Sequence, residues 1–429
     1  MVTTMDATLR ILRHKLSRSP RRFYWDARAL GAELAATMDG SRRDFRAHVI
    51  RDELRFVTGR VRPIEGETQM RAHAAADWLL RAQTASADGG VSYGYFPCRG
   101  PERGWKPSYP ETTGYIMTSL LEYSRRFPDR PVADQVRRMA LWEADIQMKS
   151  GAVQGGPVQP PEKQTPAAFN TGMVLDGWCS AYAAFGDERI LQAARAAADW
   201  LANDLDERGY FRTNGEFVGQ GDLKVYTCLC AWAMYRLGDI VNDERYRRSA
   251  VRAVEAALAQ QQPNGWFSCN CLMRPEAPLT HTIGYTLQGI AEVGALAGRD
   301  DFIGATSKAI DQLAQRVTAR GYLPGCFYAD WQPAIFSACL TGSAQVAIVA
   351  YRLYELRGRR EHRQFADLLV NWLKGVQAID APDINVNGAI AGSFPIFGEY
   401  MRGGYPNWAT KYLLDALLLQ DRVAVRAAG

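Results

Sequence analysis

The sequence of 429 residues lacks several features that assign a chain to a class at once. It has no run of about 18 apolar residues that could cross a bilayer, and it does not begin with an apolar segment followed by a small-residue cleavage site. It also has no low-complexity segment, which argues against long disordered regions. We therefore expect a globular, cytoplasmic protein.

Cysteine is present, but not in the pattern of a disulfide framework. The eight Cys residues are spread from Cys98 to Cys339, and several fall in expected core helices, so reduced thiols fit best. Cys269 and Cys271 together with His281 are zinc-compatible, but Cys-x-Cys is an unusual spacing and no second Cys/His group follows. We predict no metal and no cofactor, with zinc at these three residues as the weaker alternative.

Acidic residues are scarce near the N-terminus. Residues 1–63 hold 14 Lys and Arg against 7 Asp and Glu, an excess of 7 positive charges. This excess is larger than the net charge of the whole chain, which is +5. A solvated helix face explains this excess best, and peripheral contact with a membrane or an acidic protein is the alternative. We infer no nucleic-acid binding.

We divide the chain into a basic helical extension, 1–63, and one large domain, 64–429.

A unit of roughly 55 to 60 residues recurs in that large domain. Its first half is an expected outer helix with a Trp, followed five residues later by Gln in three copies, at Trp78 and Gln83, Trp142 and Gln147, and Trp372 and Gln377. A Gly-rich turn follows in five of the six units, where glycine can end a helix in the left-handed conformation. We expect Trp78, Trp142, Trp200 and Trp372 to lie in outer helices and to pack inward.

The second half of each unit is an expected inner helix. It starts near a Thr and continues as an apolar segment rich in Gly and Ala, which indicates burial on both sides. Short loops return the chain to the next outer helix. The pattern predicts an all-α ring of six outer and six inner helices, an (α/α)6 toroid with the long loops at one rim. The Thr residues at the inner-helix starts are Thr113, Thr171, Thr227, Thr282, Thr341 and Thr410.

Two segments of this repeat, Gln83 to Gly90 and Gln260 to Trp266, resemble the squalene-cyclase and prenyltransferase type of toroid, and more broadly the (α/α)6 carbohydrate-active enzymes. The resemblance covers about residues 65 to 420. Leu279 to Tyr285 and Cys339 to Gln345 look like motifs of little-characterised bacterial proteins associated with polysaccharide production. This resemblance implies the fold and leaves the reaction open, because the architecture carries many activities.

The inner-helix starts should bring distant residues together at the long-loop rim. Their unpaired N–H groups would favour an anionic ligand there. His281, at one such start, is a candidate acid or base near neutral pH, with Tyr285 one turn away on the same face. Glu111 is either a helix cap or an acid/base group, and Tyr226 is a further candidate base. We expect His281 within reach of Asn170, Tyr226 or Glu111.

The rim loops are also rich in aromatic and charged residues. Aromatic rings either stack on sugars or plug the open end of the ring, and we expect about half to do each. The segment from Pro382 to Trp408 is long enough to cover part of the site. The predicted substrate-binding residues are Trp105, Tyr109, Asn170, Asp330, Trp331, Gln345, Glu399, Arg402, Trp408 and Lys411.

Three functions remain compatible with these residues. The preferred one is an enzyme that acts on an acidic, uronate-containing bacterial polysaccharide or its precursor by acid/base chemistry, as an epimerase, lyase or hydrolase. A terpenoid-cyclase-like enzyme is the second, although the Asp-x-Asp-Asp motif of such cyclases is missing. A non-catalytic glycan-binding or assembly protein is the third. A polar lining of the ring would favour sugar chemistry.

Overall fold

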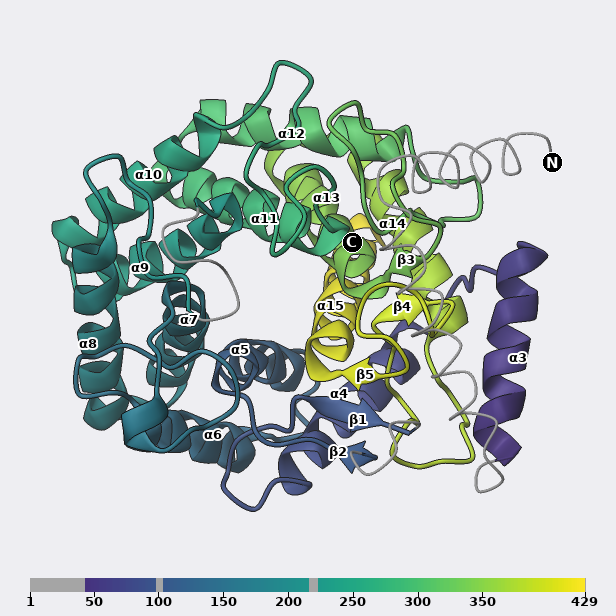
Figure 1. Cartoon of the computed structure of the whole chain (residues 1–429), viewed down its shortest axis with the longest axis horizontal. Helices are drawn as coiled ribbons and strands as arrows, with labels where there is room; N and C mark the ends of the chain where they lie inside the picture. Colours follow the sequence, from purple (N-terminus) through teal and green to yellow (C-terminus); the bar gives the residue numbers. More distant parts are fainter. Residues whose placement is uncertain (1–42, 98–102, 216–222, 429) are drawn as a thin grey trace.

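The computed structural model describes residues 43–97, 103–215 and 223–428, and it confirms the predicted ring of two helical layers (Figure 1). In the inner layer each helix packs against the next, and the last packs against the first. The inner helices are α5 (Pro110–Arg126), α7 (Ala168–Phe185), α9 (Leu229–Ile240), α11 (Thr280–Ala297), α13 (Leu340–Arg357) and α15 (Asn407–Ala428). The outer helices are α4 (Thr68–Thr84), α6 (Ala133–Ile146), α8 (Glu188–Asp204), α10 (Glu244–Leu258), α12 (Asp300–Ala314) and α14 (Arg360–Val376).

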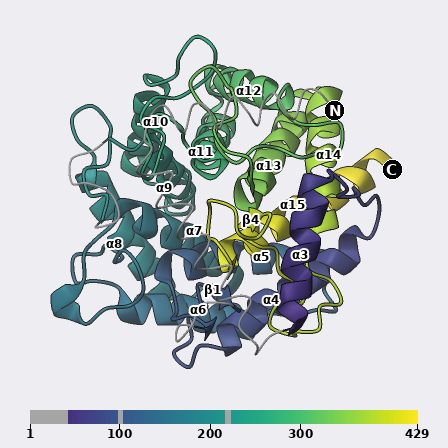
Figure 2. The same ribbon diagram turned by 45° about the vertical axis from the view of Figure 1, so that its right-hand side comes forward.

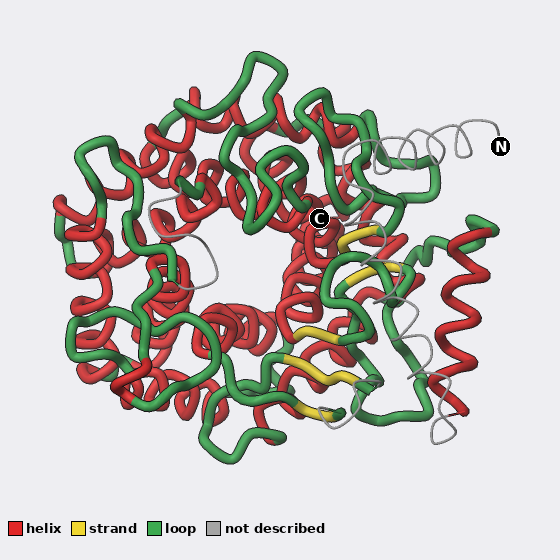
Figure 3. Tube along the Cα trace, viewed as in Figure 1, coloured by secondary structure: helices red, strands yellow, loops and turns green. Residues whose placement is uncertain are grey.

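The helices pair through their short connections. Each inner helix from α5 to α13 packs against the outer helix that follows it, whereas α15 packs against α4. The sixth pair is therefore made by the two ends of the ring. The long loops carry short strands that tie them together, and Figure 3 shows these strands on one side of the ring. The first sheet contains β2 (Gly104–Trp105), β1 (Gly94–Phe96) and β5 (Tyr405–Pro406), and the second contains β3 (Ala338–Cys339) and β4 (Ser393–Phe394).

The recurring Thr joins each inner helix to the loop before it. Thr171 Oγ1 accepts a hydrogen bond from the Val153 N–H at 2.9 Å and donates one to the Ala167 carbonyl at 2.8 Å. Thr113 and Thr410 accept in the same way from the loops before α5 and α15. Because a buried N–H needs an acceptor, a hydroxyl at this position fixes where the loop enters the core.

We expect Thr171→Val to lower the free energy of unfolding by about 1–3 kcal/mol, because the buried Val153 N–H would lose its acceptor. Thr341→Val is the matched control, since the Thr341 hydroxyl is buried without a hydrogen-bond partner. It should leave stability unchanged or slightly higher. Urea denaturation of both variants measures the difference. Equal losses at the two positions would show that the hydroxyl contact is not what stabilises the loop.

The recurring Gln joins neighbouring outer helices. Gln147 Nε2 donates to the Gly151 carbonyl at 2.8 Å and to the Ala193 carbonyl of α8 at 3.0 Å. Further glutamines donate in the same way to the carbonyls of α6, α12 and α4, so the last contact closes the ring. These are Gln83, Gln261 and Gln377.

The glycine turn is also present in the sixth unit, where the sequence pattern had no close copy. Gly388 has φ +94°, and a Cβ atom there would lie 2.1 Å from the Ala74 carbonyl of α4. Gln377 donates to the Gly388 carbonyl at 3.0 Å, as Gln147 does to Gly151. The turn went unrecognised because eleven residues separate Gln377 from Gly388, against four in the Gln147 unit.

The four repeat tryptophans all lie in outer helices, as predicted. Trp78 and Trp372 are almost fully buried and Trp142 nearly so, and each packs over the glycine turn of the adjacent unit. Trp200 differs, because it is only partly buried at the edge of the core.

Ion pairs repeat around the outer surface. In each case an arginine at or just before the start of one outer helix contacts an acidic residue of the preceding outer helix. Exposed pairs of this kind contribute little individually. The pairs are Arg130–Asp77, Arg189–Asp145, Arg245–Asp199, Arg299–Glu255 and Arg359–Asp311.

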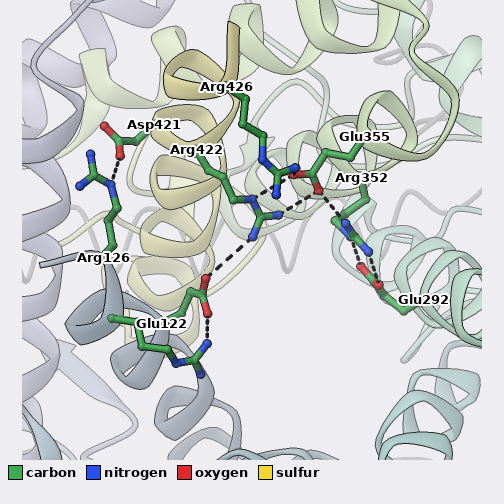
Figure 4. A network of polar contacts seen from close by, with 9 residues as sticks. Glu122, Arg126, Glu292, Arg352, Glu355, Asp421, Arg422 and Arg426 are labelled. Carbon is green, nitrogen blue, oxygen red and sulfur yellow. Dashed lines mark hydrogen bonds and ion pairs between the residues drawn. The ribbon is translucent and has the colours of Figure 1, made fainter. Parts of the chain in front are cut away.

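A larger charged network links the inner helices at the short-loop end (Figure 4). Arg352 of α13 bonds to Glu292 of α11 at 2.8 Å and to Glu355 at 2.6 Å. Arg422 and Arg426 of α15 also donate to Glu355. Burial raises the pKa of Glu355, but the hydrogen bonds and charges of its arginine partners outweigh burial and leave this pKa below its usual value. The C-terminal helix is thereby fixed to its neighbours.

The described part of the predicted N-terminal extension contains α3 (Arg43–Val57), which lies along the outside of the ring (Figure 2). Arg55 donates to the Gly375 carbonyl, and the Phe56 ring contacts Tyr322 and Phe394. Most of the basic residues expected to meet a membrane or acidic partner lie before residue 43, outside the described residues. In the described residues, no helix is both long enough and apolar enough to cross a bilayer.

Candidate functional site

Besides Tyr109, which interacts with it directly, five tyrosines gather around Glu111, the second residue of α5. Burial raises the pKa of every one of them, and the charge of the Glu111 carboxylate is among the effects that raise it further. They come from α5, α11, α15, the 3-10 turn before α9 and the loop before β5. This tyrosine cluster consists of Tyr115, Tyr226, Tyr285, Tyr400 and Tyr412.

Ring contacts hold the cluster together. Tyr285 lies at the centre, with its ring centroid 6.0 Å from that of Tyr412 and 6.4 Å from that of Tyr226. Tyr115 and Tyr412 face one another at 5.7 Å. Phe169 of α7 packs between Tyr226 and Tyr285 at 5.2 and 4.7 Å. The inner-helix starts therefore bring together residues that are distant in sequence, as predicted.

Glu111 has an unusual electrostatic environment. Burial raises the pKa of its carboxyl group to about 8, and the nearby Tyr109 hydroxyl offsets only part of this effect. The group is therefore mostly protonated at neutral pH. A carboxylic acid in this state can give a proton to a ligand and, once ionised, can take one back.

His281 also belongs to this group, but its protonation differs from our expectation. Its ring lies 4.3 Å from Tyr285, and its Nδ1 is 2.7 Å from Gln345 Oε1. Gln345 is thus its hydrogen-bond partner, rather than Asn170, Tyr226 or Glu111. Burial lowers the pKa of His281 to about 4, so the imidazole is neutral near pH 7. With Nδ1–H donating to Gln345, Nε2 presents a lone pair.

Several buried polar atoms at this end of the inner helices lack a hydrogen bond of good geometry among the described residues. Three of them belong to the candidate site, namely the Tyr115 hydroxyl, Asn170 Nδ2 and Gln345 Nε2, and each lies near a tyrosine hydroxyl group. Asn170 is 4% exposed, and Tyr115 and Gln345 are more buried still. A buried donor without an acceptor costs about 1–3 kcal/mol, and binding sites are where such groups are commonly found. All three can donate to a ligand oxygen.

The sixth long loop reaches this site, as its length suggested. The Tyr400 ring lies 5.3 Å from His281, and its hydroxyl accepts a hydrogen bond from Trp408 Nε1 at 2.9 Å. The ring of Trp408 also contacts that of Tyr109 at 6.4 Å. Tyr400, a member of the cluster, therefore forms an aromatic border of the site together with Tyr109 and Trp408.

Lys411 lies over the rings of Tyr115 and Tyr412 with its charge already compensated. Its Nζ is 2.7 Å from Asp415 Oδ2 and 3.9 Å from the centre of the Tyr412 ring. The side chain is only 7% exposed. The predicted role of Lys411 in binding a substrate carboxylate would require this buried pair to separate.

Three other predicted binding residues lie apart from the cluster. The Trp105 indole packs on Trp78 and donates to Asn385. Trp331 is 1% exposed and donates to the Asn264 carbonyl, so its ring fills space between loops. Asp330 is exposed in a turn, where it accepts from the Gln332 N–H. The two tryptophans pack the loops in place, as expected for about half of the rim aromatics.

Glu399 and Arg402 lie in the sixth loop near Tyr400. Glu399 pairs with Arg274, and Arg402 donates to the Gly398 carbonyl at 3.4 Å.

The zinc alternative finds no support. Cys271 is buried, Cys269 is partly buried, and no group of three potential metal ligands occurs among the residues that the structure describes.

Tyr115, Tyr400 and Tyr412 were not predicted from the sequence. Two of them carried a usable signal, because Tyr115 and Tyr412 each follow a repeat Thr by two residues, and Tyr115 is also one helical turn after Glu111. No comparable pattern marks Tyr400, whose position depends on the path of the sixth loop.

The lowered pKa of His281 predicts a pH effect on stability. Because the pKa is about 4 in the folded state and about 6.5 in an unfolded chain, the unfolded chain binds more protons between these values. The fold should lose stability as the pH falls through this window. We expect the His281→Gln variant to lose less stability than the wild type over this window. The Tm of both proteins at pH 6.5 and pH 4.5 measures the difference. An equal loss in the variant and the wild type would contradict the assignment.

Comparisons with known proteins identify the fold. No family model matches the chain, and no curated protein matches its sequence. Among solved structures, an unsaturated glucuronyl hydrolase specific for heparin aligns with a TM-score of 0.67 and 14% identity, over 83% of this chain and 98% of that one. The unsaturated glucuronyl hydrolase of Bacillus sp. GL1, responsible for the degradation of glycosaminoglycan, gives 0.65 and 15%, over 83% and 97%. That of Streptococcus agalactiae gives 0.61 and 14%, over 85% and 94%.

These similarities confirm the (α/α)6 toroid, because the aligned regions cover most of each chain. At this level of identity they establish the fold and leave the activity to be argued from the site.

Proposed function

We propose that this protein is a carbohydrate-active enzyme that acts on a uronate-containing oligo- or polysaccharide by acid/base chemistry, most simply as a hydrolase. The observation that carries the proposal is Glu111, a carboxylic acid whose pKa burial raises to about 8 amid five tyrosines. An acid of this kind suits protonation of a glycosidic oxygen or of an unsaturated bond at pH 7.

The surrounding groups fit a sugar. Aromatic faces at Tyr109 and Trp408 can pack against a pyranose ring, and the amide N–H groups of Asn170 and Gln345 can donate to its hydroxyl groups. Neutral His281, oriented by Gln345, can accept a proton from a hydroxyl group or a water molecule. The names of the three structural neighbours reported above support a uronate substrate and a degradative reaction rather than polysaccharide production.

One of the two alternatives fits the site less well. A terpenoid-cyclase-like enzyme needs apolar walls, whereas this cluster presents hydroxyl, amide, imidazole and carboxyl groups. A non-catalytic glycan-binding protein would use the same aromatic rings and amide groups, so measured turnover is what separates it from an enzyme.

The direct test is incubation with glucuronyl disaccharides, one saturated and one unsaturated in the glucuronyl ring, with mass spectrometry of the products. Release of a monosaccharide from either disaccharide would support the proposal and identify the preferred ring. Binding without turnover of either would favour the glycan-binding alternative. Absence of both binding and turnover would contradict a uronate substrate.

A further inference from the structure

An ion pair joins two loops beside the tyrosine cluster. Arg274 lies in the loop before α11, and Glu399 lies between β4 and β5. Arg274 Nη2 is 2.5 Å from Glu399 Oε2. The residue after Glu399 is Tyr400, whose ring contacts His281 at 5.3 Å. The pair is therefore one residue away from the border of the candidate site.

This arginine differs from the other cation of the site that was expected to bind a carboxylate. Lys411 is 7% exposed, lies over the Tyr412 ring and is bonded to Asp415. The Arg274 and Glu399 side chains are 29% and 19% exposed, so a ligand in solution can reach this pair without disrupting the core.

We propose that Arg274 binds the carboxylate of the uronate substrate, and that Glu399 occupies the same position on the guanidinium group until the substrate replaces it. The inference rests on the proposed function and adds the residue that selects acidic over neutral sugars. It requires no covalent step, because one carboxylate exchanges for another on the same cation.

The energetics favour such an exchange. A partly exposed ion pair contributes about 0–1 kcal/mol, so displacing Glu399 costs little. The planar guanidinium group can hold the incoming carboxylate through two parallel hydrogen bonds. A neutral sugar offers no carboxylate to replace that of Glu399, and this difference selects against neutral substrates.

The two members of the pair should therefore respond in opposite directions. We expect Arg274→Gln to weaken binding of a glucuronyl disaccharide by about tenfold or more, with no change for the matching glucosyl disaccharide. Glu399→Gln removes the internal competitor and should tighten binding of the glucuronyl disaccharide by about 2- to 5-fold. Isothermal titration calorimetry with the full-length chain measures the affinity of the wild type and of both variants for each disaccharide. Added salt should weaken glucuronyl binding more in the wild type than in Arg274→Gln.

The matched control is the Arg130–Asp77 pair on the outer surface, with side chains 39% and 43% exposed. Arg130→Gln and Asp77→Asn should leave both affinities unchanged. If Arg274→Gln and Glu399→Gln weaken binding together, the pair only holds the loops and the inference is overturned. Should Arg274→Gln unfold, the sign of the Glu399→Gln effect still decides. If the wild type binds the two disaccharides equally or binds neither, the proposed uronate substrate is itself contradicted. The role of Arg274 is then contradicted as well.

Discussion

Glu111→Gln is expected to lower turnover of the responsive glucuronyl disaccharide by about 100- to 10,000-fold, because the amide cannot transfer a proton. The side chains have nearly the same size, so substrate affinity should change little. Steady-state kinetics of the purified variant measures both quantities. A variant with wild-type turnover would remove Glu111 from the chemistry and leave His281 and Tyr226 as candidates.

The raised pKa of Glu111 also predicts how turnover changes with pH. The acid form of Glu111 is present below its pKa of about 8, so a step that needs this proton should slow as the pH rises through 8. The stability of the fold depends on the protonation of the same carboxyl group. Its pKa is higher in the folded than in the unfolded chain, so stability falls between about pH 4.5 and pH 8 as the pH rises. Glu111→Gln should therefore be more stable than the wild type at pH 8.

Glu143→Gln is the matched control for that variant. Glu143 lies in outer helix α6, is fully buried, and neither carboxyl oxygen has a hydrogen-bond partner. Burial, with a smaller contribution from Asp88, raises its pKa well above the usual value. The substitution should also increase stability at pH 8, but it should leave turnover unchanged. Loss of turnover in both variants would mean that the effect of Glu111 is structural.

The second large effect is expected from Trp78. Its indole is fully buried, packs over the Gly388 turn and donates to the Asn385 carbonyl at 2.8 Å. Trp78→Ala should lower the free energy of unfolding by about 3–5 kcal/mol, because it removes a large buried side chain and leaves a cavity at the point where the ring closes. Denaturant unfolding measures the change.

Trp200→Ala provides the comparison. Because Trp200 is only partly buried, its truncation should cost less than that of Trp78, although the repeat alone predicts equal costs. Equal losses at the two positions would mean that the position in the repeat, rather than burial, determines the loss in the free energy of unfolding.

The fold could be predicted because its repeated contacts are made by residues visible in the sequence. Gln147 binds its own turn and the next outer helix, and Thr171 binds the loop before its own helix. Each interaction needs one particular side chain at one position, so the residue recurs wherever the contact recurs. Gly388 escaped recognition because its turn comes after a longer segment.

The candidate site could be predicted only in part. Glu111, His281, Tyr226 and Tyr285 belong to inner-helix starts, and the repeat fixes their height around the ring. Whether a rim aromatic faces a ligand or fills space depends on how the loops pack, which no local pattern records. Trp331 and Trp408 illustrate this, since one is buried between loops and the other borders the cluster.

The protonation state of His281 was also beyond the sequence. An exposed imidazole exchanges protons near neutrality, whereas burial beside Tyr285 and Gln345 shifts its pKa to about 4. The same physical effect acts in the opposite direction on Glu111. Burial disfavours whichever form carries the charge, so it keeps the acid protonated and the histidine neutral.

The pairing of α15 with α4 has a consequence for synthesis of the chain. Thr68 donates to Gln420 at 3.1 Å, and Gln69 donates to Asp421 at the same distance, so the inner layer of the ring closes through its last helix. A nascent chain that has yet to release α15 is an open arc whose apolar inner helices lack one neighbour, and such surfaces are prone to aggregate. The same adjacency predicts that a circular permutant, with these ends joined and a new opening at a short loop such as residues 186–187, should fold to the same ring.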